Sequence, residues 1–279
     1  MGRWFARFLL QEGKEVMITG RNEKKLLEAR EQSGAETTTS FSSAVKSADV
    51  VLISVPIDNF EEVVKQLQPH LNPEQIIIDI TSIKVLPVET MHKHIKTGVV
   101  LGTHPMFGPG ARDIRNQNLV LTPTNDKETT LAQKTKQYLE ARGARATLMT
   151  PREHDEMMAV ILGLSHFIAI VTADTLLSLD KLKQMEAIGG STYKVLLTLA
   201  KGVVSENPEF YASLQMNLPK ITEIEELFQR NSKIWGDIIK NRDGKELVSR
   251  MNALRGRMEK SDPDFRKAYE NMYQLLEGL

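Results

Sequence analysis

The sequence predicts a doubly wound parallel α/β domain, residues 1–150, followed by an all-helical domain, residues 151–279. Short apolar runs alternate with helix-length segments throughout the first part, as they do in a parallel sheet covered by helices. Two of these runs, "DVVLIS" and "QIIIDI", are apolar without alternation, which is typical of strands buried on both faces. After "TPREHDEMM" the pattern predicts helices only.

The overall composition limits the classes of function. The 36 basic residues balance the 36 acidic ones, so no excess charge favours nucleic acid or an anionic membrane. Cysteine is absent, which excludes disulfides, thiol catalysis and cysteine metal sites. The sequence shows neither a signal-peptide pattern nor an unbroken apolar run of about 18 residues. We therefore expect a soluble, cytoplasmic protein that binds neither nucleic acid nor membrane.

The first predicted element is an amphipathic helix. Trp4, Phe5, Phe8 and Leu9 fall on one helical face, and Gly13 follows the last apolar turn, where a left-handed residue commonly ends a helix. A helix that packs on a parallel sheet normally follows a strand. We therefore expect the first strand of this sheet to lie upstream of Met1, outside this chain.

The remaining elements of the first domain follow in alternation. Helices are predicted over Phe60–His70 and Asp126–Arg142. Strands are predicted over residues 15–19, 49–56, 75–81, 98–105, 118–123 and 145–150. Such sheets bind ligands outside the carboxyl ends of their strands, so polar residues that follow these runs are the candidate site residues.

The helical domain is predicted to begin with a capping box. Thr150, Pro151 and Glu153 have the residue types and spacing of that motif, with proline at the first helical position. A nearly all-apolar helix follows over Glu153–Leu179. A helix that is apolar all round is expected to be buried, here against helices of its own domain or of a second subunit. Further helices follow, with breaks at Asn207-Pro208 and Asp262-Pro263.

Two short features indicate a dinucleotide. Gly2, directly before the first helix, matches the last glycine of a G-x-G-x-x-G fingerprint, whose helix N-terminus holds the pyrophosphate. "TGR" places Gly20 and Arg21 at the end of the second strand, where an arginine can pair with a 2′-phosphate. These features predict NADP, with NAD as the alternative cofactor. The simpler readings are a helix with no cofactor role and a turn with a solvated arginine.

Polar residues also close two later strands. "DITSIK" (Asp79 to Lys84) ends one strand, and "GTHPMFGPG" (Gly102 to Gly110) ends the next with His104 directly at the strand end. A histidine with an ordinary pKa of about 6.5 suits proton transfer near neutral pH. The competing interpretation is a hydrogen-bonded core histidine. The pair in "HKH", His92 and His94, points apart on a helix and does not predict a metal site.

"DITSIK", "THPMFGP", "GLSHF" and "NPEFYASLQM" occur in an order and spacing that resemble the prephenate dehydrogenase family of tyrosine biosynthesis. The resemblance covers essentially the whole chain. It implies a Rossmann-like nucleotide-binding domain and a helical domain that forms a homodimer. It also implies oxidative decarboxylation of prephenate to 4-hydroxyphenylpyruvate, with hydride transfer to NAD(P).

The resemblance implies roles for individual residues. His104 is similar to the family's proton acceptor, and Lys84 falls at a family lysine near the reacting groups. Residues expected near the cofactor, besides Gly2, Gly20 and Arg21, are Ser54, Pro56 and Ser82. Residues expected in the substrate pocket are His166, Tyr211 and Gln215. For His166 and Tyr211 the residues alone are equally typical of core packing.

One position departs from the family pattern. Related sequences carry an arginine six residues before the proline of "NPEFY", where it holds a substrate carboxylate; here Gly202 stands there, with Lys201 beside it. Lysine supplies charge without the paired donors of a guanidinium. Three alternatives remain open: Lys201 compensates, another basic residue contributes, or the substrate differs and is arogenate or another hydroxyacid. The absent first strand separately leaves open a catalytically impaired regulator of the same fold. The chain as numbered is expected to bind nucleotide weakly or not at all.

Overall fold

The structure, a computed structural model, describes residues 1–277. The chain forms two compact units, each of which is described by itself. The first comprises Met1–Met158 with the short segment Met216–Leu218, and the second comprises Ala159–Gln215 with the chain from Pro219 onward.

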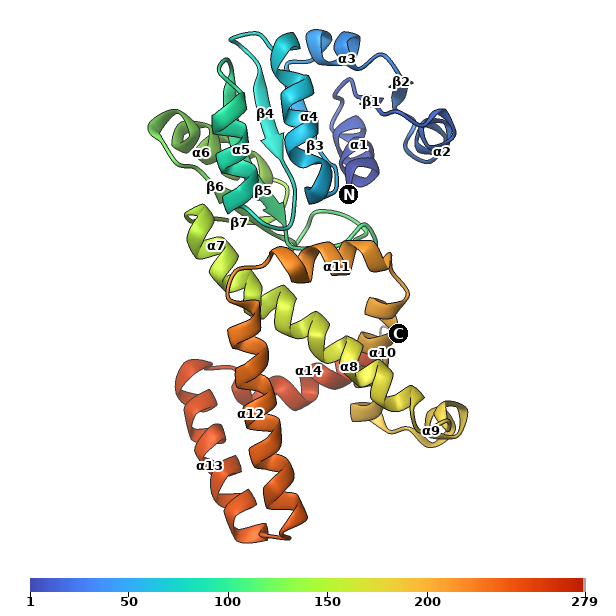
Figure 1. Cartoon of the computed structure of the whole chain (residues 1–279), viewed down its shortest axis with the longest axis vertical. Coiled ribbons are helices and arrows are strands. Elements are labelled where there is room, and N and C mark those ends of the chain that lie inside the picture. Colours follow the sequence, from blue (N-terminus) through green and yellow to red (C-terminus); the bar gives the residue numbers. More distant parts are fainter. Residues whose placement is uncertain (278–279) are drawn as a thin grey trace. The chain divides into compact units, whose positions relative to one another are not determined.

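The first unit contains seven strands in two sheets (Figure 1). In the smaller sheet, β1 pairs in parallel with β2; in the larger one the order is β3-β4-β5-β6-β7. The strands are β1 (Met17–Thr19), β2 (Glu36–Thr38), β3 (Val50–Ile53), β4 (Ile76–Asp79), β5 (Val99–Pro105), β6 (Asn118–Thr122) and β7 (Arg145–Leu148). Parallel pairing of β1 with β2 and of β3, β4 and β5, with helices between the strands, is typical of a doubly wound sheet. The predicted fold class is confirmed.

Two details differ from the prediction. Strand β6 pairs with β5 in antiparallel fashion, so β6 and β7 run against the other strands of the larger sheet. The loop after β5 therefore returns the chain along the same sheet edge instead of crossing over through a helix. Strand β2 was missed because its sequence, "ETT", lacks the apolar residues that mark a strand.

Helices cover both faces of the larger sheet. Trp4 and Phe5 of α1 pack with Leu101 and Leu121 on one face, and Phe60 of α4 lies in a second cluster on the other. Gly13 has a φ of 71°, so the predicted left-handed end of the first helix is confirmed. The helical segments of this unit are α1 (Gly2–Gln11), α2 (Glu23–Ser33), α3 (Phe41–Ser47), η1 (Ile57–Asn59), α4 (Phe60–Leu67), η2 (Gln68–His70), α5 (Val85–His94), α6 (Asp126–Glu140) and α7 (Pro151–Met158).

The second unit is helical, and within residues 1–277 no strand follows β7. The predicted breaks at Asn207-Pro208 and Asp262-Pro263 are confirmed, because α11 begins at Pro208 and α13 ends at Ser261. Its segments are a π-helix (η3, Ala159–Leu164), α8 (Ser165–Leu177), α9 (Leu182–Ile188), α10 (Ser191–Val204), α11 (Pro208–Asn217), α12 (Ile221–Lys240), α13 (Gly244–Ser261), η4 (Phe265–Lys267) and α14 (Ala268–Glu277).

The long apolar helix begins with the predicted capping box. The Thr150 backbone N–H donates to Glu153 Oε2 at 2.9 Å, and the Glu153 N–H donates to Thr150 Oγ1 at 3.2 Å. Helices α7, η3 and α8 then form one run, Pro151–Leu177, that is long and apolar enough to cross a membrane by length and composition alone. In its most apolar window, of mean hydropathy 1.9, only 11% is buried. Helices of the same chain therefore do not enclose this run. The expectation that helices of its own domain bury it is not met.

Candidate active site

A buried ion pair stands at the end of β4. Lys84 Nζ contacts Asp79 Oδ2 and donates to the Thr103 carbonyl at 2.5 Å. The other Asp79 oxygen accepts from the Thr81 backbone N–H at 2.7 Å and from the Thr81 hydroxyl at 2.6 Å. Lys84 and Asp79 are both fully buried. The pair joins the turn after β4 to β5, one residue before His104.

Burial sets the protonation tendencies of this pair. Removal from water lowers the pKa of Lys84 and raises the pKa of Asp79, while the contact between the two groups opposes both shifts. A buried charge without its partner is strongly unfavourable. The Lys84 ammonium therefore stays bound to Asp79 and to the Thr103 carbonyl, and it holds the ends of β4 and β5 together.

A row of three hydrogen-bonded side chains lies beside this pair. His104, at the end of β5, places Nδ1 2.9 Å from His154 Nε2, and His154 Nδ1 lies 2.7 Å from Asp155 Oδ1. The Asp155 carboxylate also accepts the backbone N–H groups of Lys84 at 2.7 Å and Val85 at 2.9 Å. We call His104, His154 and Asp155 the histidine row. Strand β5 and helix α7 supply its three residues, and the start of α5 supplies the N–H groups that Asp155 accepts.

Both histidines of the row are uncharged near neutral pH. Burial, with His154 and Lys84 as further causes, lowers the pKa of His104 well below its ordinary value. Burial also lowers the pKa of His154, although Asp155 opposes this shift. His104 is 5% exposed, and among the described residues its Nε2 has no hydrogen-bond partner. A neutral imidazole with one free nitrogen can accept a proton.

The predicted cofactor residues lie at the start of α1 and at nearby strand ends. A Cβ atom at Gly2 would lie 3.1 Å from Ser54 Oγ, so glycine allows α1 to begin directly against the end of β3. No acidic residue stands in the first turn of α1, so the positive end of the helix dipole is uncompensated there. The side chain of Arg21 is 83% exposed and its nearest acid, Glu62, is 4.0 Å away.

The other predicted cofactor residues stand on separate turns. Gly20 follows β1, Pro56 follows β3 on the exposed surface, and Ser82 follows β4 in a half-buried position. All three come after the carboxyl ends of parallel strands, where doubly wound sheets bind their ligands.

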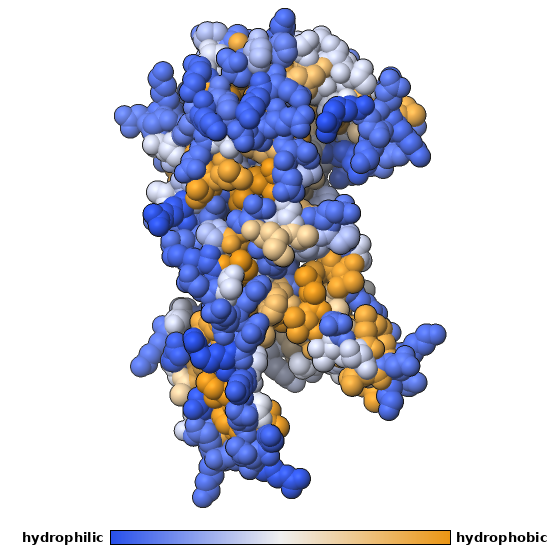
Figure 2. Space-filling view, in the orientation of Figure 1, coloured by the Kyte–Doolittle hydropathy of each residue, from blue (hydrophilic) through white to orange (hydrophobic). Residues whose placement is uncertain are grey.

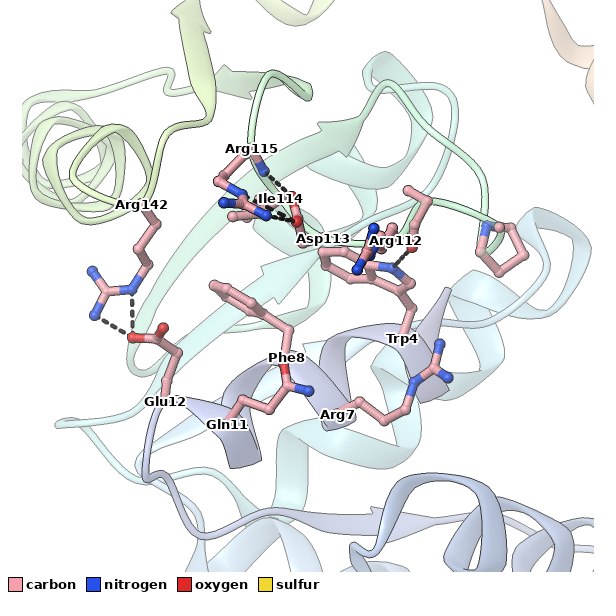
Figure 3. A pocket seen from close by; sticks show the side chains of 13 residues that line it. Trp4, Arg7, Phe8, Gln11, Glu12, Arg112, Asp113, Ile114, Arg115 and Arg142 are labelled. Atoms are coloured by element: carbon pink, nitrogen blue, oxygen red, sulfur yellow. Dashed lines mark hydrogen bonds and ion pairs between the residues drawn. The ribbon is translucent and has the colours of Figure 1, made fainter. Parts of the chain in front are cut away.

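A cavity of about 650 Å³ lies between α1 and the loop of residues 109–115 (Figure 3). Trp4 Nε1 donates to the Ala111 carbonyl at 2.7 Å and fastens this loop to α1. Two ion pairs, Arg142 with Glu12 and Arg115 with Asp113, stand on the cavity wall. None of the predicted site residues lines this cavity.

In the second unit the structure brings together three of the predicted substrate residues. The rings of His166 (α8) and Tyr211 (α11) meet edge to face with centroids 4.8 Å apart, and Gln215 Nε2 donates to the Gly163 carbonyl at 2.9 Å. Gly163 belongs to η3, and a π-helical turn of this kind often marks a functional site. His166 Nδ1 and Gln215 Oε1 are buried without a hydrogen-bond partner among the described residues.

Lys201, the fourth predicted substrate residue, is engaged elsewhere. Its ammonium forms an ion pair with Glu186 of α9 on the surface of the second unit, where about half of its side chain is exposed. The lysine charge is therefore already partnered by a carboxylate.

Comparison with known proteins decides the family. The model for the nucleotide-binding domain of prephenate dehydrogenase matches residues 5–148, and the model for its dimerization domain matches residues 150–253. The chain belongs to the prephenate dehydrogenase family.

Relatives and solved structures agree with this assignment. The probable arogenate/prephenate dehydrogenase of Methanocaldococcus jannaschii is 35% identical over 90% of this chain and 57% of its own length. The T-protein of Enterobacter agglomerans is 31% identical over 78% of this chain and 54% of its own length. The chain thus spans little more than half the length of these two curated relatives.

Two crystal structures share the fold. Prephenate dehydrogenase from Aquifex aeolicus, solved with hydroxyphenyl propionate and NAD⁺, has a TM-score of 0.76 and 22% identity, and the match covers 94% of this chain and 95% of that chain. Synechocystis arogenate dehydrogenase has a TM-score of 0.69 and 22% identity, covering 94% of this chain and 96% of that chain. At these identities the likeness concerns the fold.

The site contains two residues that the sequence did not predict. His154 and Asp155 stand in the first turns of α7, directly beside Glu153 of the capping box. Both are almost fully buried. The available signal was the cluster of titratable residues in "REHDE" at the start of a helix that becomes apolar, but its contact with His104 spans 50 residues.

Proposed function

We propose that the protein is an NAD(P)-dependent dehydrogenase that converts prephenate to 4-hydroxyphenylpyruvate, with His104 as the proton acceptor. Membership of the family supports the reaction class. The observation that carries the proposal is the state of His104: a buried, neutral imidazole whose Nδ1 is occupied and whose Nε2 is free, at the carboxyl end of β5. Lys84 holds the strand end that carries His104 in place through its contacts with Asp79 and the Thr103 carbonyl. It does not itself transfer the proton.

The chemistry requires one base and one hydride acceptor. A bound nicotinamide would supply the acceptor for the hydride of the carbinol carbon of the substrate ring. His104 Nε2 takes the hydroxyl proton, so that the carbinol oxygen becomes the oxygen of the product phenol. The electron pair of the bond to the ring carboxylate enters the ring as carbon dioxide leaves, and the resulting phenolate oxygen takes a proton back from protonated His104. Aromatisation drives this loss, so the protein has to orient the substrate and remove one proton.

The residues present fit a dinucleotide. The first turn of α1, with Gly2 against Ser54 and no acid nearby, suits the negative pyrophosphate. Arg21 is exposed and only loosely opposed by Glu62, so its guanidinium is free to pair with a 2′-phosphate. On this basis we propose NADP in preference to NAD. Arg21→Asp should lower NADP affinity at least tenfold and leave NAD affinity within about threefold; equal loss for both would remove Arg21 from cofactor selection.

The second unit supplies the proposed substrate residues. His166, Tyr211 and Gln215 share one face of α8 and α11, and unpartnered nitrogen and oxygen atoms among them can bind a polar substrate. Arogenate is the second candidate substrate. Both substrates carry a side-chain carboxylate, but arogenate also carries an ammonium group beside it. Gly202 replaces the arginine of related sequences and Lys201 is paired with Glu186, and this lower positive charge favours the side chain that has its own ammonium group.

A second copy of the chain is the proposed partner. The helical unit leaves large apolar side chains exposed on η3, α8 and α10, and Figure 2 shows apolar surface over this unit. Exposed residues of this kind include Val160, Ile161, Ile170, Val171, Leu196 and Leu199. Because the matching family model is a dimerization domain, we propose a cytoplasmic homodimer formed through residues 151–279, with residues 1–150 as the nucleotide-binding half. Light scattering should give twice the monomer mass. A monomeric protein that binds lipid vesicles would contradict this.

Turnover with defined substrates tests the function. Prephenate and arogenate are offered separately, each with NADP and with NAD, and reduced nicotinamide is followed by absorbance. Turnover of prephenate with a lower KM than arogenate supports the proposal, and the reverse preference supports the second candidate. Nucleotide binding is measured first by isothermal titration. Absence of turnover with all four combinations, by protein that binds the dinucleotide, would overturn the assignment as an enzyme and favour a regulatory protein of the same fold.

A further inference from the structure

The position of Asp155 determines which protons the histidine row can hold. Its two oxygens accept the backbone N–H groups of Lys84 and Val85 at the start of α5, at 2.7 and 2.9 Å. Peptide N–H groups only donate, so both contacts require acceptor oxygens. The N-terminus of α5 also favours negative charge at this place. Asp155 is therefore a fixed carboxylate that can only accept the third contact, from His154 at 2.7 Å.

The rest of the row follows from counting protons. His154 Nδ1 must carry a proton because it faces the Asp155 carboxylate. A neutral imidazole carries one N–H, so His154 Nε2 is an acceptor. The only hydrogen bond that His104 Nδ1 can form with it, at 2.9 Å, is one in which His104 donates. His104 then has its proton on Nδ1 and a bare Nε2.

We propose that His154 and Asp155 are positioning residues that hold His104 in the tautomer whose Nε2 is free to accept a proton. This inference rests on the proposed function, in which His104 Nε2 is the acceptor. Which nitrogen of a histidine is protonated depends on the hydrogen bond made by the other, and a carboxylate orients a catalytic histidine in the same way in serine proteases. Neither His154 nor Asp155 acts on the substrate itself.

The other charged groups near the histidine row do not hydrogen-bond to its imidazole nitrogens. Lys84 Nζ is directed to Asp79 and to the Thr103 carbonyl, and Asp79 accepts from Thr81. Within the part of the chain that the structure describes, neither group hydrogen-bonds to an imidazole nitrogen. Protonation of His154 would reverse the hydrogen bond between the two histidines. Both nitrogens of His154 would then donate, and His104 Nδ1 would have to accept. The row therefore provides the free Nε2 only while His154 is neutral.

Nitrogen-15 NMR of histidine-labelled protein reports tautomers directly and needs neither substrate nor cofactor. The chain has six histidines, and His104→Asn and His154→Gln assign the two relevant ring systems. In the unchanged protein both rings should show a protonated Nδ1 and a bare Nε2. His154→Phe, which removes the acceptor, should shift His104 towards the tautomer protonated at Nε2. His70→Gln is the matched control, since His70 lies outside the row, and it should leave the His104 signals in place.

Kinetics provide the second readout. His154→Phe should lower kcat by about tenfold to a hundredfold, less than complete loss of the base, with cofactor affinity unchanged. His154→Gln, whose amide oxygen can accept from His104, should recover part of the lost kcat. If His154→Phe does not fold by circular dichroism, the tautomer in the unchanged protein and the His154→Gln variant still decide the matter.

The two proposals fail in different ways. A wild-type His104 protonated at Nε2, or an unchanged tautomer in folded His154→Phe, would overturn the positioning role whatever the activity. Absence of turnover in wild type, together with the expected tautomer, would instead overturn the proposed function and leave the arrangement of the row in place.

Discussion

The two polar clusters of the molecule differ in how their hydrogen bonds are satisfied. In the first unit, Asp79, Lys84 and the histidine row satisfy one another and leave one imidazole nitrogen free. In the second unit, His166 Nδ1 and Gln215 Oε1 are buried without partners among the described residues. Buried polar groups normally have partners, and those without them are often explained by function. The hydrogen bonds of the first cluster fix the positions of its side chains, whereas the second cluster has a free nitrogen and a free oxygen that can bind a ligand.

Loss of the free nitrogen should have the largest effect. His104→Asn removes the proton acceptor and should lower kcat about 10²- to 10⁴-fold, with dinucleotide affinity unchanged. Stopped assays at saturating cofactor, with isothermal titration of the nucleotide, measure both quantities. Activity near that of wild type would show that the first cluster is structural and would remove the contrast with the second.

Breaking the buried ion pair should have the largest effect on stability. Lys84→Met leaves Asp79 as an uncompensated buried charge and should lower the free energy of unfolding by about 3–5 kcal/mol. Lys65→Met is the matched control, because Lys65 pairs with Glu61 on the exposed surface, where such pairs contribute about 1 kcal/mol or less. Urea unfolding of both variants compares them. Adding Asp79→Asn to Lys84→Met should restore part of the loss, whereas a further decrease would argue against a charge effect.

Changes in the second cluster should affect binding more than turnover. Tyr211→Phe removes the hydroxyl of a half-buried tyrosine whose ring contacts His166, and should raise the KM for the ring substrate about five- to tenfold, with kcat little changed. Tyr269→Phe is the control, because Tyr269 is exposed and its hydroxyl lies 3.2 Å from that of Tyr273, away from His166. A fall in kcat with constant KM in Tyr211→Phe would place the hydroxyl in the chemistry and merge the two clusters into one function.

Local sequence patterns predicted the elements well. Six strands were located by apolar runs, and Gly13 and the Thr150–Glu153 capping box were identified from residue types at fixed spacings. These features depend on neighbours a few residues apart. The predicted direction of β6 was wrong, because a run of apolar residues does not show whether a strand runs parallel or antiparallel to its neighbour. The return of the loop after β5 depends on its packing against α1.

Long-range contacts set the limits of prediction at the site. His104 was identified from its strand end and its resemblance to a family motif, but its partner His154 lies 50 residues away. Asp155 gains its role from two backbone N–H groups of another helix, which side-chain patterns do not show. Similarly, the apolar residues of α8 indicate burial without saying by what, and in this chain they are left exposed.

The smallest expected effect is a dependence of stability on pH, to which the buried histidines of both clusters contribute. The pKa values of His104 and His154 lie below the ordinary 6.5, whereas in the unfolded chain both histidines bind protons as the pH falls through 6.5. In that interval the unfolded state binds more protons, so stability should decline as the pH drops below 6.5 towards the folded-state pKa values. The acid limb of kcat/KM should likewise lie below 6.5, because the neutral base persists there. His104→Asn should flatten the stability curve, since one of these groups is gone. Denaturant unfolding between pH 7.5 and pH 5 checks this, with His70→Gln as the control; a curve of the same slope in His104→Asn would mean that another group titrates.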